Sequence, residues 1–537
     1  MIAVTLVTCV TSPFANGESD GSNVMDYRDY GEMNEVLTRL AERPHVSVHT
    51  IGHSVDYSMS PVSEHPIPAI RIQSNSASQG YRPAILFDGG IHAREWLSSE
   101  CLLELAEHLS MHGVRPDSEA AAALRNADVW IIPMVNPAGR IIDDPAAGDP
   151  RKYYKGGPDP SGWRGNGDTR VSQHGIDLAR NFSRDWTNAN SDPTKKHWRG
   201  AAPFSARESS ALRQFVQNEM ISMSVHIHSN SQDVATVWDE SDKAGLAMRE
   251  RAAGVWLQGC GELANTLLRP LDELNLRMKT RRLGTSYGQF TAWLPYPSDT
   301  VGQPDYGTAR GIQTVLIELP FANPLYNNYY NGLFQSRPKD GSDSFHPSGR
   351  NTRALIRKAF IPMALYFIRQ AASPSCATRN TSAGEQPIPG GRATSDLGFV
   401  AARIAPATGE GNSITTVPAE HSLDGEVQPA YDAVTPGQHA IEYIVQNYGI
   451  KKNDGIIQLS VESRHAGTDG KWTAGQRSVR RLRSIDPLTN VSGRFRLRVA
   501  LNREYRITAK VPTEKDDFEL NNLKVWRFIT LKNESTR

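Results

Sequence analysis

Two hydrophobic patterns divide this chain, and the change between them lies near residue 373. Before that point, short apolar runs alternate with segments whose apolar residues recur at helical spacing. Val129–Val135 is one such run, and Glu95–Met111 is one such helical segment. This alternation is typical of an α/β protein, in which helices cover the faces of a sheet. The sequence therefore predicts an α/β unit over residues 27–372.

A second unit is indicated after a change in composition. Residues 373–397 are rich in Ser, Thr, Pro and Gly, as expected of a linker. Beyond the linker, segments such as Ile456–Ser463 and Leu523–Thr530 alternate apolar and polar residues, with turn-forming residues between them. This pattern predicts a smaller all-β domain of sandwich type over residues 398–537. We identify no catalytic group of residues in it.

The N-terminus and the charge balance limit where the protein acts and what it binds. Residues 1–26 begin with MIAVTLVTCVTSPFA, which resembles the apolar part of a secretory signal without its usual positive charge. We expect a secreted or periplasmic protein, and a cytoplasmic protein with an apolar tail is the alternative.

With 59 basic and 58 acidic residues, the formal charge of +1 argues against nucleic acid as the main partner. No apolar run reaches the ~18–20 residues of a transmembrane helix.

The first candidate for chemistry is a His and a Glu three residues apart. His92 and Glu95 follow a predicted strand and precede a predicted helix. At such a junction the two side chains can point the same way, as two ligands of one metal ion must. The alternative is a surface histidine beside a glutamate that favours the start of the helix.

A third ligand candidate lies in the predicted strand Ile221–His228. Strand alternation places His226 and His228 on one face, and the position of His228 at the strand end favours it, because sites in α/β sheets open there. Two His and one Glu leave a fourth metal position for water, which is the arrangement of hydrolytic zinc enzymes. A purely structural strand histidine is the alternative.

A carboxylate interrupts an otherwise apolar strand near residue 318. Glu318 lies within the run Val-Leu-Ile-Glu-Leu. Glutamate is rarely buried without a partner. The functional interpretation is a general base whose pKa is raised by apolar surroundings. The alternative is a position on an edge strand, facing water.

Together these residues resemble the zinc metallocarboxypeptidases of the pancreatic carboxypeptidase A/B type. The motifs run in the family's order over about residues 27–372: Gly-Ile-His-Ala-Arg-Glu-Trp (90–96), Asn-Pro-Ala-Gly (136–139), Gly-Trp-Arg (162–164), Gly-Ile-Asp-Leu-Ala-Arg-Asn-Phe (175–182), Ile-His-Ser (227–229), Asp-Tyr (305–306) with Gly-Ile (311–312), and Ile-Glu-Leu (317–319). The resemblance implies a mixed eight-stranded sheet with helices on both faces. It also implies one Zn²⁺ per chain, held by His92, Glu95 and His228, with Glu318 as the general base.

The resemblance assigns three further residues to the substrate. It implies that Arg164 faces the developing oxyanion, that Arg180 binds the terminal carboxylate, and that Tyr296 folds over bound substrate. Ala179 stands where relatives have an asparagine that also anchors the carboxylate, so one hydrogen-bond donor is missing here. Pro304 stands where B-type relatives have an acid, which implies a preference for neutral or apolar C-terminal residues.

The function implied is hydrolysis of the C-terminal peptide bond of peptides and proteins through a metal-activated water. Because the resemblance begins close to residue 27, we expect activity without removal of a globular pro-domain. The missing donor at Ala179 keeps open a zinc amidohydrolase that acts on a non-standard peptide, for example of the peptidoglycan type. A non-catalytic secreted peptide-binding protein with the same fold is a further alternative.

Overall fold

The computed structural model describes most of both predicted units. The described residues are 27–56, 63–74, 81–125, 127–143, 175–195, 197–229, 232–237, 243–267, 278–282, 287–296, 308, 310–319, 353–371, 397–407, 412–417, 419–421, 427–448, 451–487, 489–512 and 522–530. Residues 1–26, Arg164, Pro304 and the linker up to residue 396 lie outside these ranges, so the predictions made for them stay predictions.

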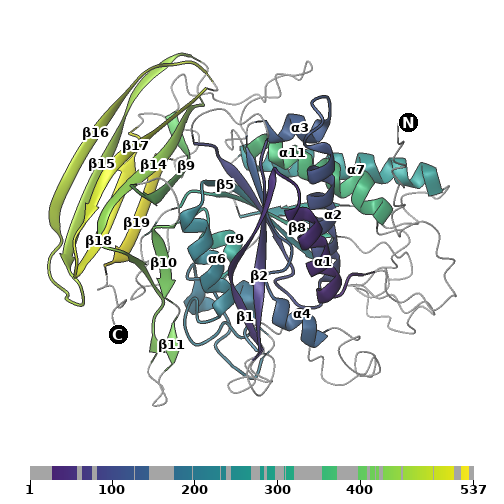
Figure 1. Ribbon diagram of the computed structural model, residues 1–537, viewed down its shortest axis with the longest axis horizontal. Coiled ribbons are helices and arrows are strands. Elements are labelled where there is room, and N and C mark those ends of the chain that lie inside the picture. The colour runs from purple at the N-terminus through teal and green to yellow at the C-terminus, as the bar shows by residue number, and fades with distance from the viewer. Residues whose placement is uncertain are drawn as a thin grey trace, which may run out of the picture.

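A mixed sheet of eight strands forms the centre of the first unit (Figure 1). Its strands are β1 (Val46–Asp56), β2 (Ser63–Ile72), β3 (Ala84–Gly89), β4 (Asp128–Ile132), β5 (Ile221–Ser229), β6 (Asp233–Thr236), β7 (Lys279–Arg282) and β8 (Gln313–Leu319). They lie in the order β1-β2-β4-β3-β5-β8-β6-β7, and β4, β3, β5 and β8 run parallel. The predicted α/β class and the eight-stranded sheet are confirmed.

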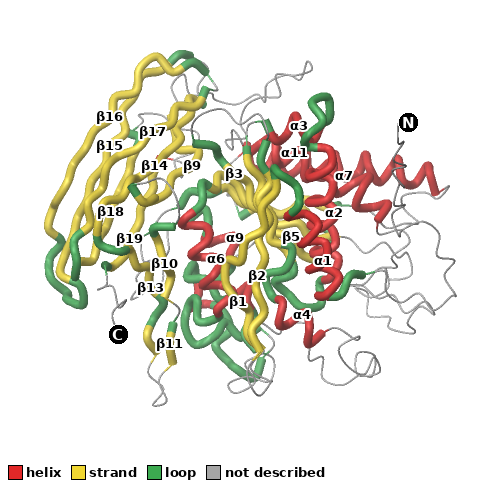
Figure 2. The backbone as a smooth tube through the Cα atoms, viewed as in Figure 1, coloured by secondary structure: helices red, strands yellow, loops and turns green. Residues whose placement is uncertain are grey.

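Helices cover both faces of this sheet (Figure 2). On one face lie α1 (Tyr30–Ala41), α2 (Trp96–His112), α3 (Glu119–Leu124), α7 (Lys243–Leu267) and α11 (Ile361–Ala371), which is preceded by a π-helical turn over Ile356–Phe360. On the other lie α6 (Arg207–Asn218), α9 (Phe290–Trp293) and the irregular residues 175–206. The short helix α4 (Pro137–Asp143) and the single turns η2 (Leu178–Arg180) and η3 (Trp186–Asn188) complete the unit. Among the described helices, none has the length and apolar character that crossing a membrane would require.

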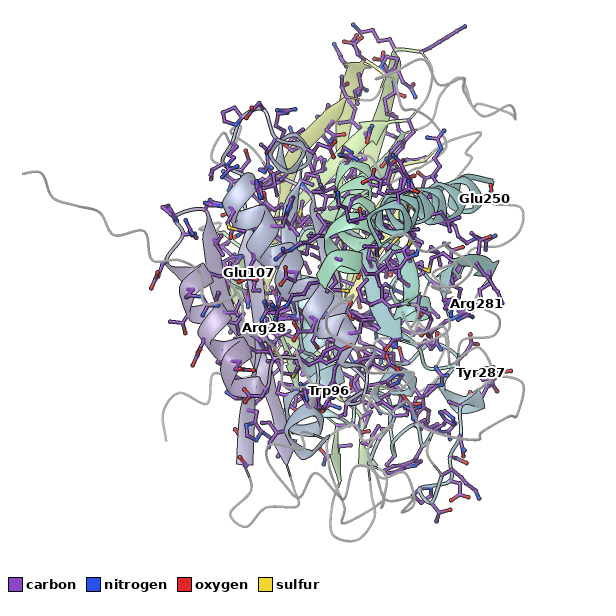
Figure 3. The ribbon with its side chains drawn as sticks, turned by 90° about the vertical axis from the view of Figure 1, so that its right-hand side faces the viewer. Arg28, Trp96, Glu107, Glu250, Arg281 and Tyr287 are labelled. Atoms are coloured by element: carbon purple, nitrogen blue, oxygen red, sulfur yellow. The ribbon has the colours of Figure 1, made fainter. Side chains whose placement is uncertain are left out.

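Helix α1 is held at its start by local and long-range contacts. Asp29 caps the helix by accepting from the backbone N–H of Glu32, whose carboxylate accepts from the N–H of Asp29 in return. The preceding Arg28 reaches helix α2, where its guanidinium lies 3.0 Å from Glu100 and 3.2 Å from Glu107 (Figure 3). These contacts fix the N-terminal end of the described chain against α2.

The second unit is an all-β sandwich. One sheet has the order β10-β13-β19-β18-β15-β16, and the other has the order β17-β14-β9. The strands are β9 (Leu397–Pro406), β10 (Ile414–Val417), β13 (Tyr431–Val434), β14 (Gly437–Asn447), β15 (Asn453–His465), β16 (Thr473–Ile485), β17 (Asn490–Val499), β18 (Arg503–Lys510) and β19 (Leu523–Ile529), with a small hairpin of β11 (Glu420–His421) and β12 (Val427–Gln428). Apolar residues of both sheets, such as Ile441 and Ile507, share one core. The predicted all-β class is confirmed.

The sandwich contacts the α/β unit through helix α6. The side chain of Asn218 bonds to the backbone N–H groups of Ser413 and Ile414 and to the carbonyl of Ile414, as a neighbouring strand would. From β19, the ammonium group of Lys524 donates to the carbonyl of Arg310, just before β8. Burial lowers the pKa of Lys524 to about 7. The two units therefore meet through buried polar contacts, and Met220 packs with Val400 and Tyr448 in an apolar cluster across the same boundary.

A buried carboxyl group on helix α6 gives the folded protein a pH-dependent stability. Glu208 is fully buried and accepts a hydrogen bond from the hydroxyl of Ser54 at 2.6 Å. Burial raises its pKa from 4.5 to about 7 although the Ser54 bond opposes the shift. Because the folded protein then binds the proton more tightly than the unfolded chain, stability falls as pH rises between these two values.

We expect the substitution Glu208→Gln to remove this pH dependence. A shift of this size corresponds to about 3 kcal/mol of unfolding free energy, fully lost once the pH exceeds the folded pKa. Urea titrations at pH 4 and at pH 8 give the unfolding free energy of the variant minus that of the native protein. This difference should be larger by this amount at pH 8 than at pH 4, in favour of the variant. A constant difference at both pH values would contradict the assignment.

Candidate active site

Three neighbouring parallel strands bring the predicted site residues to one edge of the sheet. His92 follows the end of β3, His228 lies near the end of β5, and Glu318 lies near the end of β8. His228 and Glu318 are direct neighbours in the register of β5 and β8. Because the carboxyl ends of parallel strands open at the same edge, side chains far apart in sequence meet there.

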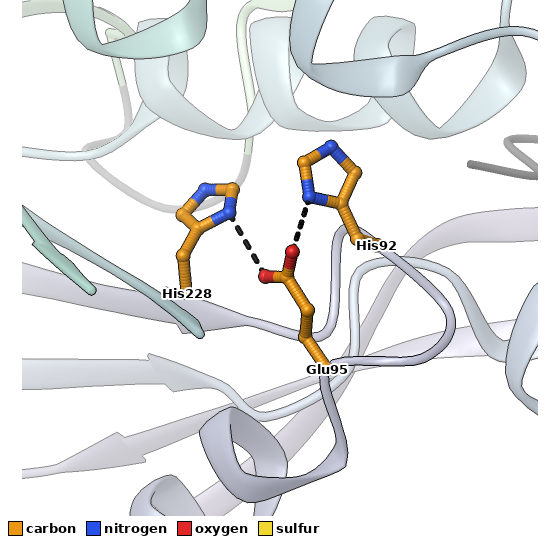
Figure 4. A group of neighbouring side chains, drawn as sticks. All are labelled: His92, Glu95 and His228. Atoms are coloured by element: carbon orange, nitrogen blue, oxygen red, sulfur yellow. Dashed lines mark hydrogen bonds and ion pairs between the residues drawn. The ribbon is translucent and has the colours of Figure 1, made fainter. Parts of the chain in front are cut away.

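His92, Glu95 and His228 form one compact group of metal-ligating side chains (Figure 4). Nδ1 of His92 lies 2.8 Å from Oε1 of Glu95, and Nδ1 of His228 lies 3.0 Å from Oε2 of the same carboxylate. One ligand atom from each residue lies within 4.8 Å of the others, and all three residues are buried. Two imidazole nitrogens and a carboxylate oxygen are a donor set that suits zinc.

The backbone around Glu95 fixes its carboxylate. The N–H of Glu95 donates to the carbonyl of His92, and the hydroxyl of Ser98 donates to the carbonyl of Glu95. The N–H of Ser229, at the end of β5, donates to Oε2 of Glu95 at 3.2 Å. Gly90 has a φ of +63°, and a Cβ there would lie 2.8 Å from the Ser99 hydroxyl oxygen, so this turn requires glycine.

The electrostatics of the group favour positive charge at its centre. Burial disfavours a charged His92, but Glu95 and Asp177 outweigh it and raise its pKa to about 10. Burial likewise disfavours a charged Glu95, but His92 and His228 outweigh it and lower its pKa to about 2. Protons on the imidazoles thus balance the buried carboxylate. A divalent cation bound by the three residues would supply that charge in their place.

Asp177 is a site residue that the sequence reasoning did not assign. Its Oδ1 lies 3.2 Å from Nε2 of His92, on the ring edge that faces away from Glu95. Its Oδ2 lies 3.2 Å from Nδ1 of His197, and its Oδ1 accepts from the N–H of Ala179. A carboxylate on the second nitrogen of a ligating histidine fixes ring orientation and tautomer. Its only sequence signal was its place in the motif of residues 175–182, and the contact with His92 spans 85 positions.

Glu318 lies beside this group on an interior strand. Strand β8 lies between β5 and β6, so the alternative of an edge-strand position is wrong. The Glu318 side chain is partly buried. Desolvation raises its pKa to about 7, with smaller contributions from the surrounding charges, of which His228 opposes the shift and Glu95 adds to it. A carboxyl group with a pKa near neutrality is suited to accept a proton from water.

His226, the alternative ligand, has a different partner. Its Nδ1 lies 2.6 Å from Oδ2 of Asp88, near the end of β3, and its ring packs edge-on against Phe290. His226 does not belong to the compact group of His92, Glu95 and His228. His228 lies closer to the end of β5 than His226 does, and this position distinguishes the member of the group from the other histidine.

The structure places two of the three predicted substrate-binding residues. Within the described residues, the Arg180 guanidinium has no ion-pair partner, and Asp177 bonds to histidines instead. Gly288 touches the backbone of Arg180, since a Cβ there would lie 2.2 Å from the Arg180 carbonyl oxygen. Tyr296 follows on the same segment, with its hydroxyl 3.4 Å from the carbonyl oxygen of Val237. Arg164 lies outside the described residues.

Comparisons with known proteins identify a family and several relatives. The sequence profile of the zinc carboxypeptidase family matches residues 33–323, which is more than half of the chain. Metallocarboxypeptidase A of Trichophyton rubrum is 31% identical over 173 residues, which cover 31% of this chain and 38% of that protein. An inactive metallocarboxypeptidase of Uncinocarpus reesii is 26% identical over 241 residues, covering 42% of this chain and 38% of the relative.

Among solved structures, carboxypeptidase A from Helicoverpa armigera is similar with a TM-score of 0.47 and 18% identity, over 67% of this chain and 78% of that one. The matched segment spans 38% of the length of each of the two fungal relatives. The profile match covers the ends of β3, β5 and β8, where His92, Glu95, His228 and Glu318 lie. The chain belongs to the zinc carboxypeptidase family.

Proposed function

We propose that this protein is a zinc-dependent carboxypeptidase that hydrolyses the C-terminal peptide bond of peptides and proteins. The observation that carries this proposal is the meeting of His92, Glu95 and His228 beside Glu318 at the ends of three parallel strands. Zinc bound there supplies Lewis acidity, which polarises a carbonyl group and lowers the pKa of a water molecule.

The chain's own residues would position the substrate and move the proton. Glu318 accepts a proton from the attacking water and passes it to the leaving amine, because its pKa near neutrality permits both transfers. Arg180 binds the terminal carboxylate with its planar guanidinium, which can donate to both oxygens. Arg164 stabilises the oxyanion, and Tyr296 covers the bound substrate.

This proposal extends to the substrate preference and the cellular location of the enzyme. Pro304 in place of an acid favours neutral or apolar C-terminal residues. The leader-like residues 1–26 favour a secreted or periplasmic location.

Ala179 is buried beside Arg180 and carries no side-chain donor, which supports a second candidate function. That candidate is a zinc amidohydrolase whose peptide substrate ends in something other than a plain α-carboxylate.

One pair of peptides separates these functions. The peptides are identical and end in Phe, except that one has a free and the other an amidated C-terminus. We expect release of the last residue from the free acid alone, because Arg180 binds the carboxylate, and loss of this activity when a chelator removes the metal. Restoring zinc is the control, and it should restore the rate.

Cleavage of both peptides would contradict binding through the carboxylate and favour the amidohydrolase. Cleavage of neither, with zinc bound at one equivalent per chain, would contradict the carboxypeptidase proposal.

A further inference from the structure

An unusual concentration of arginine lies along one edge of the β-sandwich. Residues 473–498 contain seven arginines, no lysine and a single acid, Asp486. All seven are exposed: Arg477, Arg480, Arg481 and Arg483 on β16, and Arg494, Arg496 and Arg498 on β17. We call these seven residues the arginine rim. The formal charge of the whole chain, only +1, conceals it.

The rim is continuous because the two strands lie next to each other where the two sheets meet. The side-chain amide of Gln476 on β16 donates to the carbonyl of Arg496 on β17 at 3.0 Å. The guanidinium of Arg480 reaches the carbonyl of Arg494. Along β17, Arg494, Arg496 and Arg498 alternate with the buried residues Phe495 and Leu497. They therefore share one face in a row with a spacing of about 7 Å.

Within the part of the sandwich that the structure describes, the rim differs from three neighbouring arginines that do have acidic partners. Arg464 and Arg527 both pair with Glu504 at 2.6 Å, and Arg506 pairs with Glu462 at 2.7 Å. Among the described residues, no rim arginine has an ion-pair partner within 4 Å, and Asp486 pairs with Lys452 instead. Arg464, Arg506 and Arg527 are thus neutralised by glutamates, whereas no described acid pairs with the arginines of β16 and β17.

From this we propose that the arginine rim binds a linear acidic polysaccharide carrying sulfate or carboxylate groups. A guanidinium donates two parallel hydrogen bonds to such groups, and a row of them gives a repeated contact along a polymer. This binding is separate from the proposed peptidase activity and would hold the enzyme on an anionic matrix.

Other polyanions fit the rim less well. The only aromatic residue of β16 and β17 is Phe495, which is buried, so these strands offer no aromatic side chain on which nucleic-acid bases could stack. Val479 is the single exposed large apolar side chain on these strands, which is too little apolar surface for insertion into a bilayer.

A structural explanation must be tested at the same time. β16 and β17 are both edge strands, and charged side chains on edge strands prevent pairing with other molecules. If this is the only role of the rim, its removal changes solubility and leaves polysaccharide binding unchanged.

The test compares two variants of the full chain that lose the same charge. The rim variant carries Arg481→Gln, Arg496→Gln and Arg498→Gln. The control carries Arg43→Gln, Arg115→Gln and Arg125→Gln, three exposed arginines of the α/β unit. Binding of heparin and of polygalacturonate is titrated at several salt concentrations, with a DNA duplex and phosphatidylglycerol vesicles as competing probes. Thermal unfolding checks that both variants fold.

We expect the native protein to bind heparin or polygalacturonate. The rim variant should bind at least tenfold more weakly, and the control should stay within twofold. The slope of log affinity against log salt should fall by roughly one for each arginine contact removed. Any of four results would overturn the proposal. The first two are equal losses of binding in both variants, and tighter binding to DNA or vesicles than to either polysaccharide. The other two are no binding to either polysaccharide, and aggregation of the rim variant at unchanged affinity.

Discussion

Replacing Glu318 by glutamine is expected to lower kcat/KM on a free-acid peptide by about 100- to 10,000-fold, the range for loss of a general acid–base residue. Glutamine keeps the size of the side chain but cannot accept the proton of the attacking water. Zinc content should stay at one equivalent, because Glu318 is not one of the three residues grouped around the metal position. The measurement is steady-state kinetics together with metal analysis of the same sample.

A matched control for this substitution is Glu208→Gln. Glu208 is also a buried glutamate with a pKa raised to about 7, but it lies on helix α6 and bonds to Ser54, away from the strand ends. The same chemical change there should leave kcat/KM within twofold. An equal loss of activity in both variants, or loss of zinc from the Glu318 variant, would contradict the assignment of Glu318 as the base.

The sequence was most informative where strand periodicity and position act together. Glu318 stood out because a carboxylate in an apolar strand requires an explanation, and β8 proved to be interior. His228 could be preferred over His226 because sites open at the strand end, where His228 lies next to Glu318. Both arguments used only residues close together in sequence, together with one general rule about sheets.

Contacts between distant segments could not be predicted in the same way. Asp177 holds His92 from 85 positions away, and the sequence around Asp177 gives no sign of that distance. The strands β6 and β7 have four residues each, too few to show a period. Strand β16 is mostly exposed on both faces and lacks the usual alternation, so its arginines were not recognised as a surface feature.

The interface between the two units could not be predicted from the sequence either, because it depends on an ion pair between residues far apart in the chain. Nη2 of Arg213 on helix α6 lies 2.8 Å from Oδ2 of Asp432 on β13, and both side chains are almost completely buried. Asp432 also accepts from Gln217 at 2.6 Å and from Thr416 at 2.9 Å. A buried carboxylate with one ion-pair partner and two hydrogen-bond donors joins the α/β unit to the sandwich.

We expect Asp432→Ala to lower the free energy of unfolding by about 3–5 kcal/mol, because it removes the carboxylate that pairs with the buried Arg213 charge. The control is Asp486→Ala in the same sandwich, where the pair with Lys452 is more than half exposed on both sides. That change should cost less than about 1 kcal/mol. Urea unfolding monitored by tryptophan fluorescence measures both.

A double variant distinguishes a lost charge partner from a lost contact surface. In Arg213→Met with Asp432→Leu neither charge remains, so the desolvation of an unpaired ion no longer opposes folding, and most of the loss should be recovered. If the double variant is as unstable as Asp432→Ala, the loss comes from the packing and the bonds to Gln217 and Thr416, not from the stranded guanidinium. If Asp432→Ala matches Asp486→Ala, the buried pair does not hold the sandwich to helix α6, and other contacts of this helix, such as those of Asn218, hold it instead.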